Sequence, residues 1–561
     1  MSNMLLALTM LTSLIGVTGV KEASLQNNIK PKASVGSGSQ VLRLINVEDY
    51  IYEQENDEDE IDLIHQFENY AKELGYTNCV VEYNTTDTPE SMFNMVKLSP
   101  DGYDLICPSD YMIQKLIVND MLEPMHIDEV HMPNYVGKAS KTIKGRLDNI
   151  SAVNSKTNQE CFLKDYAVGY MWGTLGMLFD PTYGGRDPDT TIRDMMSWDI
   201  LWNPDYKGIS SIKDSVRDTY AIGLLHALND DFEENGQTVE GFETLMNKHN
   251  DGTYSDEEYN QKFSELFNRC DNQTLENVRK SLSKLKGNVF GMEVDSGKQD
   301  IVTGKIGINF AWSGDAVYSM QQAEEEKDLE LCYSIPETGS NIWMDAWCMP
   351  KSSRRSEAQK ELAELFLDFL STPEITAQNM EYTGYTPFTA GNEILDLTRS
   401  WYDYRYNEET ETFEDVQYTE EQMEELELQK VDLSYFFEGT LEGEYASDPN
   451  ACIFYSDCYL PYSHEDEDGN IIENNCVGRE FFTQFPDEDT INRCAVMRDF
   501  GPQNEAVLKM WEKFKSDALP AWAIILFTVE VAAILGTLSY FVVSRKMKLS
   551  LRKKRKEAEQ Q

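Results

Sequence analysis

The chain has 561 residues, too many for a single hydrophobic core, and this length predicts roughly two or three large units. It carries 98 Asp and Glu residues against 49 Lys and Arg, which gives a net charge of −49. Because binding of phosphates requires basic side chains, this balance excludes a nucleic acid as partner. It suits a cationic ligand, and a simple solubilising acidic surface explains it as well.

Two segments precede the predicted fold. Residues 1–20 have the apolar core of a signal peptide or a short signal anchor, although no basic residue precedes Lys21. Residues 21–40 end in SVGSGSQ and have the polar, flexible composition of a linker. The folded part is therefore expected to follow this linker.

Strands and helices alternate over the first part of the fold. VLRLIN at 41–46 predicts a strand, and apolar residues at helical spacing then predict a helix that ends at Gly75. CVVEYN at 79–84 and YDLICPS at 103–109 predict two further strands. This order is typical of an α/β lobe with a mainly parallel sheet, in which ligands bind beyond the carboxyl ends of the strands.

A second α/β series begins near residue 165. It contains the apolar segment DYAVGYMWGTLGMLFDP, a long helical region over 215–300, and the strands IGINFAW at 306–312 and NIWMDAW at 341–347. Residues 391–510 are acidic and rich in tyrosine, and they show little periodicity before a final amphipathic helix. We therefore expect a second α/β lobe that includes an acidic insertion.

The C-terminus carries a second membrane signal. Residues 520–543 are uncharged except for Glu530, and a basic stretch that includes RKKRK follows directly. We expect a transmembrane helix with a cytoplasmic tail at 544–561, because basic residues flank the cytoplasmic side of such helices. The folded domain would then be extracellular or periplasmic.

Motifs for catalysis and metal binding are missing from the sequence. It contains no GxSxG elbow, P-loop, GxGxxG or HExxH motif, and no CxxC pair. His126, Asp128, Glu129 and His131 form one metal-like cluster, which a solvated loop explains equally well. Four cysteines within 452–494 could form disulfides in an oxidising compartment, with their pairing left open. We expect neither an enzyme nor a cofactor or metal.

Aromatic and acidic residues recur at the predicted strand ends. Trp343 and Asp345 lie together in NIWMDAW, where a buried carboxylate requires a partner, a proton or a ligand. An ammonium group over a tyrosine or tryptophan ring gains about 0.5–2 kcal/mol. The set therefore predicts a slot for a cationic amine, with carboxylates at its ends and rings over its methylenes. Its members are Tyr50, Ser109, Tyr111, Asp214, Asp218, Trp312, Trp343, Asp345 and Tyr385.

Six ordered motifs within residues 41–390 resemble those of the spermidine/putrescine-binding proteins of bacterial ABC importers. They are YDLICPSDYMIQKL, DYAVGYMWGTLGMLFDP, SWDILWNPDYKG, INFAWSGDAVY, NIWMDAWCMPKSS and FLDFLSTPEITAQNMEYTGYTP. The resemblance implies an α/β, two-lobed class II periplasmic-binding-protein-like fold that holds a polyamine in an interlobe cleft and delivers it to a permease driven by an ATPase. The corresponding division is lobe 1 at 41–165 and 345–392, and lobe 2 at 166–344 and 393–515.

The ligand residues of that family transfer unevenly to this chain. The tyrosine of its Asn-Trp-x-x-Tyr loop transfers to Tyr50, but Val47 replaces the tryptophan. In the interlobe segment Ser215 replaces one of two adjacent acids, which leaves Asp214, and Asp218 stands in place of a glutamate. The other members of the set match the family's motifs. A cationic amine stays the expected ligand; another solute, or an extracellular sensor or adhesion role, is the alternative.

Overall fold

The computed structural model describes residues 40–53, 61–234, 236–407, 410, 412–414, 416–460, 463–465, 471–473 and 476–516. The predicted signal segment, residues 21–39 of the linker, the predicted membrane helix at 520–543 and the basic tail lie outside these ranges. Within the described ranges, no helix is both long and apolar enough to cross a membrane.

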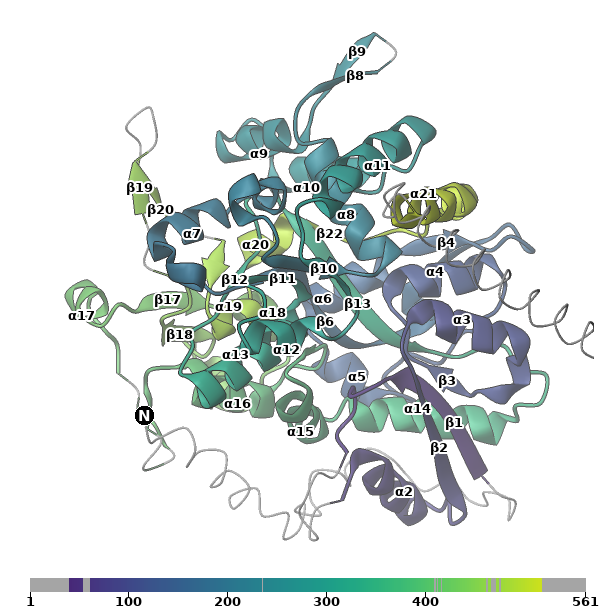
Figure 1. The fold of residues 1–561 in the computed structure, drawn as a ribbon. Helices are drawn as coiled ribbons and strands as arrows, with labels where there is room; N and C mark the ends of the chain where they lie inside the picture. The colour runs from purple at the N-terminus through teal and green to yellow at the C-terminus, as the bar shows by residue number, and fades with distance from the viewer. Residues whose placement is uncertain are drawn as a thin grey trace, which may run out of the picture.

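One sheet runs through the centre of the molecule and joins two lobes (Figure 1). Its main path has the strand order β10-β7-β11-β6-β13-β3-β1-β2. We call the side with β1 to β3 lobe 1, and the side with β7, β10 and β11 lobe 2. The long strands β6 (Ala167–Phe179) and β13 (Ser340–Cys348) are antiparallel to each other and connect the lobes.

Lobe 1 is built on three parallel strands. β1 (Gln40–Val47) pairs with both β2 (Cys79–Thr86) and β3 (Leu105–Ile106), which confirms the predicted alternation of strands and helices. Phe67 packs against Phe366 with ring centres 5.0 Å apart, so the first and last helices of the lobe share one core. The helices are α2 (Leu63–Glu73), α3 (Pro89–Leu98), α4 (Asp110–Val118), α5 (Pro133–Lys138), α6 (Lys141–Asp148) and α14 (Glu357–Leu370).

Lobe 2 extends the sheet with the short strands β7 (Ser210–Lys213), β10 (Gly291–Glu293) and β11 (Ile308–Trp312). β7 is parallel to both of its neighbours, and β11 is antiparallel to β6. Because β7 and β11 are parallel neighbours, Lys213 and Trp312 at their carboxyl ends reach the same edge of the sheet. The main helices are α8 (Val216–Ala227), α11 (Asn272–Lys286), α12 (Gly297–Val302) and α13 (Ser313–Lys327).

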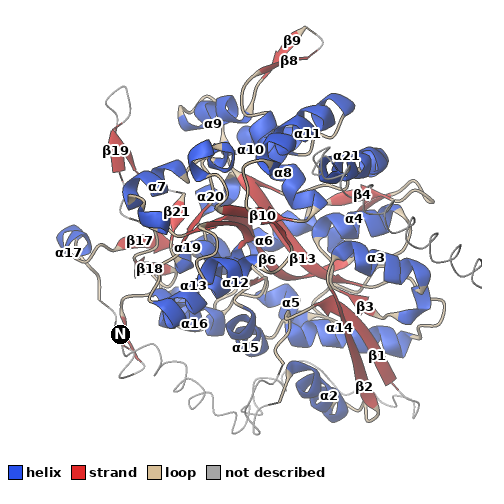
Figure 2. Cartoon of the chain, in the orientation of Figure 1, coloured by secondary structure: helices blue, strands red, loops and turns tan. Residues whose placement is uncertain are grey.

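The two connecting strands are almost completely buried between covering helices (Figure 2). β6 is buried at every position, as expected for a strand that is covered on both faces. β13 is buried at every position except Asp345, which is partly exposed. The register of β13 against β6 shifts between Asp345 and Ala346, an irregularity that can redirect a side chain. Asp345, the charged residue of NIWMDAW, therefore lies at the irregular point of a connecting strand.

The described residues within 428–499, which we call the brace, contact both lobes. Its helix α18 (Ser434–Phe437) packs against α6 of lobe 1, and α19 (Glu480–Gln484) packs against α13 of lobe 2. Its last strand, β22 (Cys494–Ala495), pairs in parallel with β13. Phe436 and Phe485 contact each other inside it, with ring centres 5.3 Å apart. The brace is therefore a folded element built from short pieces.

The described chain ends in α21 (Asn504–Ser516), the amphipathic helix that the sequence predicts. α21 packs against α11, where Lys286 donates hydrogen bonds to the carbonyls of Phe514 and Lys515 at 2.6 and 2.8 Å. The end of the described chain is thereby attached to lobe 2. All ten cysteines belong to the described residues, and none of them forms a disulfide bond there.

Candidate ligand site between the lobes

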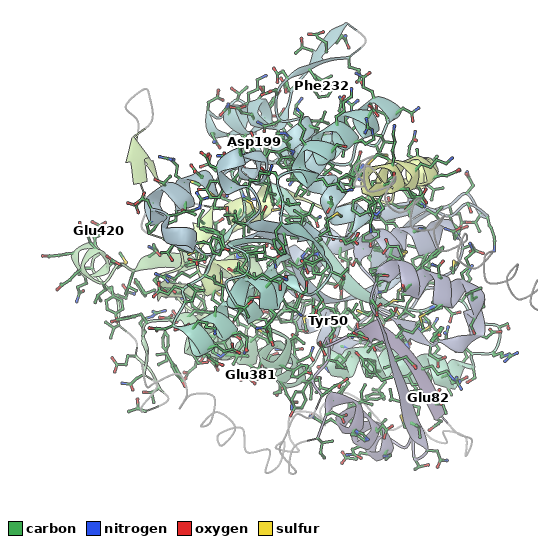
Figure 3. The ribbon with its side chains drawn as sticks, in the orientation of Figure 1. Tyr50, Glu82, Asp199, Phe232, Glu381 and Glu420 are labelled. Carbon is green, nitrogen blue, oxygen red and sulfur yellow. The ribbon has the colours of Figure 1, made fainter. Side chains whose placement is uncertain are left out.

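Asp345 has one carboxylate oxygen with a partner and one without. The hydroxyl of Tyr50 donates to Oδ2 at 2.8 Å, and Ser109 faces Asp345 as its partner in an isolated strand bridge. Oδ1 has no hydrogen-bond partner within the described part of the chain. Tyr50 lies where the two lobes meet (Figure 3). The carboxylate can therefore still accept a hydrogen bond from a group that enters between the lobes.

The surroundings of Asp345 oppose its negative charge. Burial raises the pKa of Asp345 to about 6, although the hydroxyls of Ser109 and Tyr50 act in the opposite direction. The nearby carboxyl of Asp218 also contributes to the rise. A cation placed beside Oδ1 would relieve both effects, because it favours the ionised form.

Aromatic rings form a wall next to this carboxylate. The rings of Tyr50 and Tyr385 meet edge to face with centres 5.0 Å apart, and Trp343 lies 5.7 Å from Tyr385. Two glycines make room for them, since a Cβ would lie 2.4 Å from the Tyr385 ring at Gly314 and 2.5 Å from a Trp343 ring atom at Gly173. Local glycines therefore position the wall against the sheet.

A buried lysine occupies the lobe 2 side of the site. The Lys213 ammonium lies 3.1 Å from Glu293 Oε1 and 3.3 Å from Asp315 Oδ2, and 4.3 Å from the ring centre of Trp312. The Tyr385 hydroxyl donates to the other oxygen of Asp315 at 2.8 Å, which links the lysine to the aromatic wall. Burial lowers the pKa of Lys213, but the two carboxylates outweigh it and leave the pKa raised.

A second cation, Arg217, lies at the start of α8. Its guanidinium is 4.4 Å from the ring centre of Tyr111 and 3.7 Å from that of Phe500. The adjacent Asp218 is buried, and its backbone N–H donates to the Ser215 hydroxyl at 3.4 Å. Burial raises the pKa of Asp218, while Ser215 and the charge of the lysine in lobe 2 act against the rise. Asp218 is therefore a second carboxylate that an added cation would stabilise.

All predicted site residues except Asp214 join this one network of contacts and charges. Asp214 instead pairs at the surface with Lys515 of α21, whose ammonium lies 2.7 and 2.8 Å from its two oxygens.

Sequence reasoning missed Lys213, Glu293 and Asp315. The signal available for Lys213 was its place at the end of the buried strand SSIK, directly before the predicted acid.

The metal-like cluster predicted near residue 126 is engaged in pairs within lobe 1. His126 lies 3.1 Å from Glu364, and His131 lies 2.9 Å from Asp128. The two imidazole rings stack with centres 4.7 Å apart. Over the ranges that the structure describes, no group of three or more His, Cys, Asp or Glu side chains is arranged to hold a metal ion.

Residues 63–393 match a family described as bacterial extracellular solute-binding proteins. The chain belongs to this family. Among the similar relatives of this solute-binding protein, the spermidine/putrescine-binding periplasmic protein of Escherichia coli K12 is 24% identical over 332 residues, 58% of this chain and 75% of that protein. The putrescine-binding periplasmic protein PotF of the same organism is 22% identical over 326 residues, 56% of this chain and 72% of that protein.

The comparison of structures supports the fold. A solved structure described as a putative spermidine/putrescine ABC transporter from Listeria monocytogenes is 21% identical to this solute-binding protein and has a TM-score of 0.50. The match covers 85% of this chain and 99% of that chain. The two-lobed α/β fold and the family resemblance expected from the sequence are confirmed. The family is one of solute receptors, which agrees with the prediction that the chain is not an enzyme.

Proposed function

We propose that this solute-binding protein captures a polyamine between its lobes and delivers it to the permease and ATPase of an ABC importer. The observation that carries the proposal is Asp345, a carboxylate with one unpartnered oxygen beside a wall of aromatic rings. Ammonium groups pair with carboxylates and rest on such rings, and the rings also cover methylenes. The relatives named above for spermidine and putrescine support the same ligand class.

Capture of the ligand uses the connection between the lobes. One ammonium group binds Asp345 on β13, and the chain of the amine extends toward Asp218 in lobe 2. A ligand that contacts both lobes stabilises the closed arrangement, because it binds that arrangement more tightly than the open one. We place the signal segment at 1–20, a membrane tether at 520–543 and a cytoplasmic tail at 544–561, which would keep the receptor beside its permease.

Calorimetric titration of the full chain in detergent tests this function. We expect saturable heat with putrescine or spermidine. Maltose is the uncharged control solute, and we expect no heat of binding with it. Saturation with maltose, or no heat with either amine, would contradict the proposal and direct the search to other solutes or to a protein partner.

Amine affinity is expected to depend on pH through Asp345. Because its pKa is about 6 in the free protein, the carboxyl is protonated below that pH and cannot pair with an ammonium group. Affinity for putrescine should therefore rise with pH, by up to about tenfold per unit below pH 6, and level off above about pH 7. Titrations at half-unit steps from pH 5 to 8 measure this, and an equally steep rise in Asp345→Asn would assign the titration to another group.

A further inference from the structure

Resting on the proposed function, we infer that Lys213 is a built-in ammonium group that fills one cation position of the cleft. The remaining slot then fits a ligand with two ammonium groups better than one with three. Lys213 would thus determine specificity: it selects diamines over triamines.

The contacts of Lys213 are those of a bound amine. The Lys213 ammonium donates hydrogen bonds to Asp315 and to the carbonyl of Val294, at 3.3 and 3.1 Å, and forms an ion pair with Glu293 at 3.1 Å. Its charge also lies over Trp312, a ring expected to receive the ligand. The side chain has no exposed surface. Its position is therefore fixed, and a ligand ammonium cannot take it without displacing the lysine.

Of the carboxylates in the predicted ligand set, the charge balance leaves two for the ligand. Asp315 and Glu293 both pair with Lys213, and Lys298 adds a second positive charge 3.9 Å from Asp315. Asp345 and Asp218, in contrast, have no ion pair within the described part of the chain. Two ammonium groups match these two acids. A third would approach Lys213 and meet repulsion between like charges.

Three amines that differ in length and in number of ammonium groups test this preference: putrescine, spermidine and N-propylputrescine. N-propylputrescine has nearly the length of spermidine but lacks its terminal amine. We expect the full-length protein to bind putrescine at least about tenfold more tightly than spermidine, since repulsion of like charges across a contact costs several kcal/mol. N-propylputrescine should bind more tightly than spermidine, because it keeps the length and loses the third charge. This comparison needs no variant, and so it does not depend on how a substituted protein folds.

Lys213→Met then tests the residue itself. Methionine keeps an unbranched side chain but removes the charge, so the third ammonium of spermidine can pair with Asp315. The ratio of spermidine to putrescine affinity should rise at least about tenfold, whereas Lys213→Arg should keep the original preference. Lys305→Met is the matched control, because Lys305 pairs with Asp300 at the surface at 2.9 Å.

The outcomes separate the two proposals. Failure of the unmodified protein to bind any of the three amines would contradict the proposed function. Binding of spermidine as tight as that of putrescine and N-propylputrescine would leave that function intact and overturn the role of Lys213. An unchanged affinity ratio in a folded Lys213→Met protein would overturn it as well.

Discussion

Asp345→Asn is expected to lower polyamine affinity at least about 30-fold, because removing one member of a desolvated charge pair costs roughly 2–5 kcal/mol. The asparagine keeps the shape and still accepts the hydrogen bond from Tyr50, so the loss reports the charge. Calorimetric titration with putrescine at pH 7.5 measures it. The unliganded protein should stay folded, since the carboxylate that is lost is one whose charge its surroundings oppose.

Asp300→Asn is the matched control for this variant. Asp300 pairs with Lys305 at the surface of lobe 2, outside the network that includes Asp345. Its substitution should change putrescine affinity by less than about twofold, because an ion pair at the surface contributes little free energy. If Asp345→Asn bound putrescine as tightly as this control, the carboxylate would not be the ammonium site.

Arg355→Met is expected to destabilise lobe 1 by about 3–5 kcal/mol, the usual cost of removing one partner of a buried ion pair. The Arg355 side chain is 2% exposed and lies 3.4 Å from Asp104, and it also contacts Glu123. It donates to the carbonyls of Pro350, Tyr103 and Asp104 at 2.8, 3.0 and 3.2 Å. Methionine would leave these acceptors buried without a donor, which adds to the loss of the charge pair.

Chemical denaturation followed by circular dichroism measures the effect. Arg354→Met is a close control, since the neighbouring side chain is 83% exposed and its ion pair with Asp101 is long at 3.6 Å. That variant should shift the free energy of unfolding by less than about 0.5 kcal/mol. Equal stability of the two variants would mean that Arg355 does not hold this part of the lobe together.

Much of the site could be predicted because parallel strands present their carboxyl ends at one edge. Tyr50 and Trp312 each stand at or near such an end, whereas Asp345 lies within the antiparallel strand β13; the structure brings all three into one network. Asp214 precedes the N-cap Ser215 of α8, and its partner Lys515 lies far along the chain. No local sequence pattern indicates an ion pair between residues so far apart in the chain.

The elements missed by sequence reasoning depend on contacts across the sheet. Lys213 ends β7 and Asp315 lies in the first turn of α13, and they meet because β7 is paired with β11. That pairing is a property of the tertiary fold, and neither residue is unusual in its own segment. The brace escaped prediction for a related reason, since its strands and helices are short and gain their stability from neighbours rather than from periodicity.

The brace has a consequence for the entropy of ligand capture. Asn492 accepts a hydrogen bond from Arg146 of lobe 1 at 2.7 Å, and Glu480 accepts one from Gln321 of lobe 2 at the same distance. With one folded segment attached to both lobes, the unliganded receptor samples fewer relative orientations of them. Less conformational freedom is then lost when an amine draws the lobes together, so more of the contact energy remains as affinity.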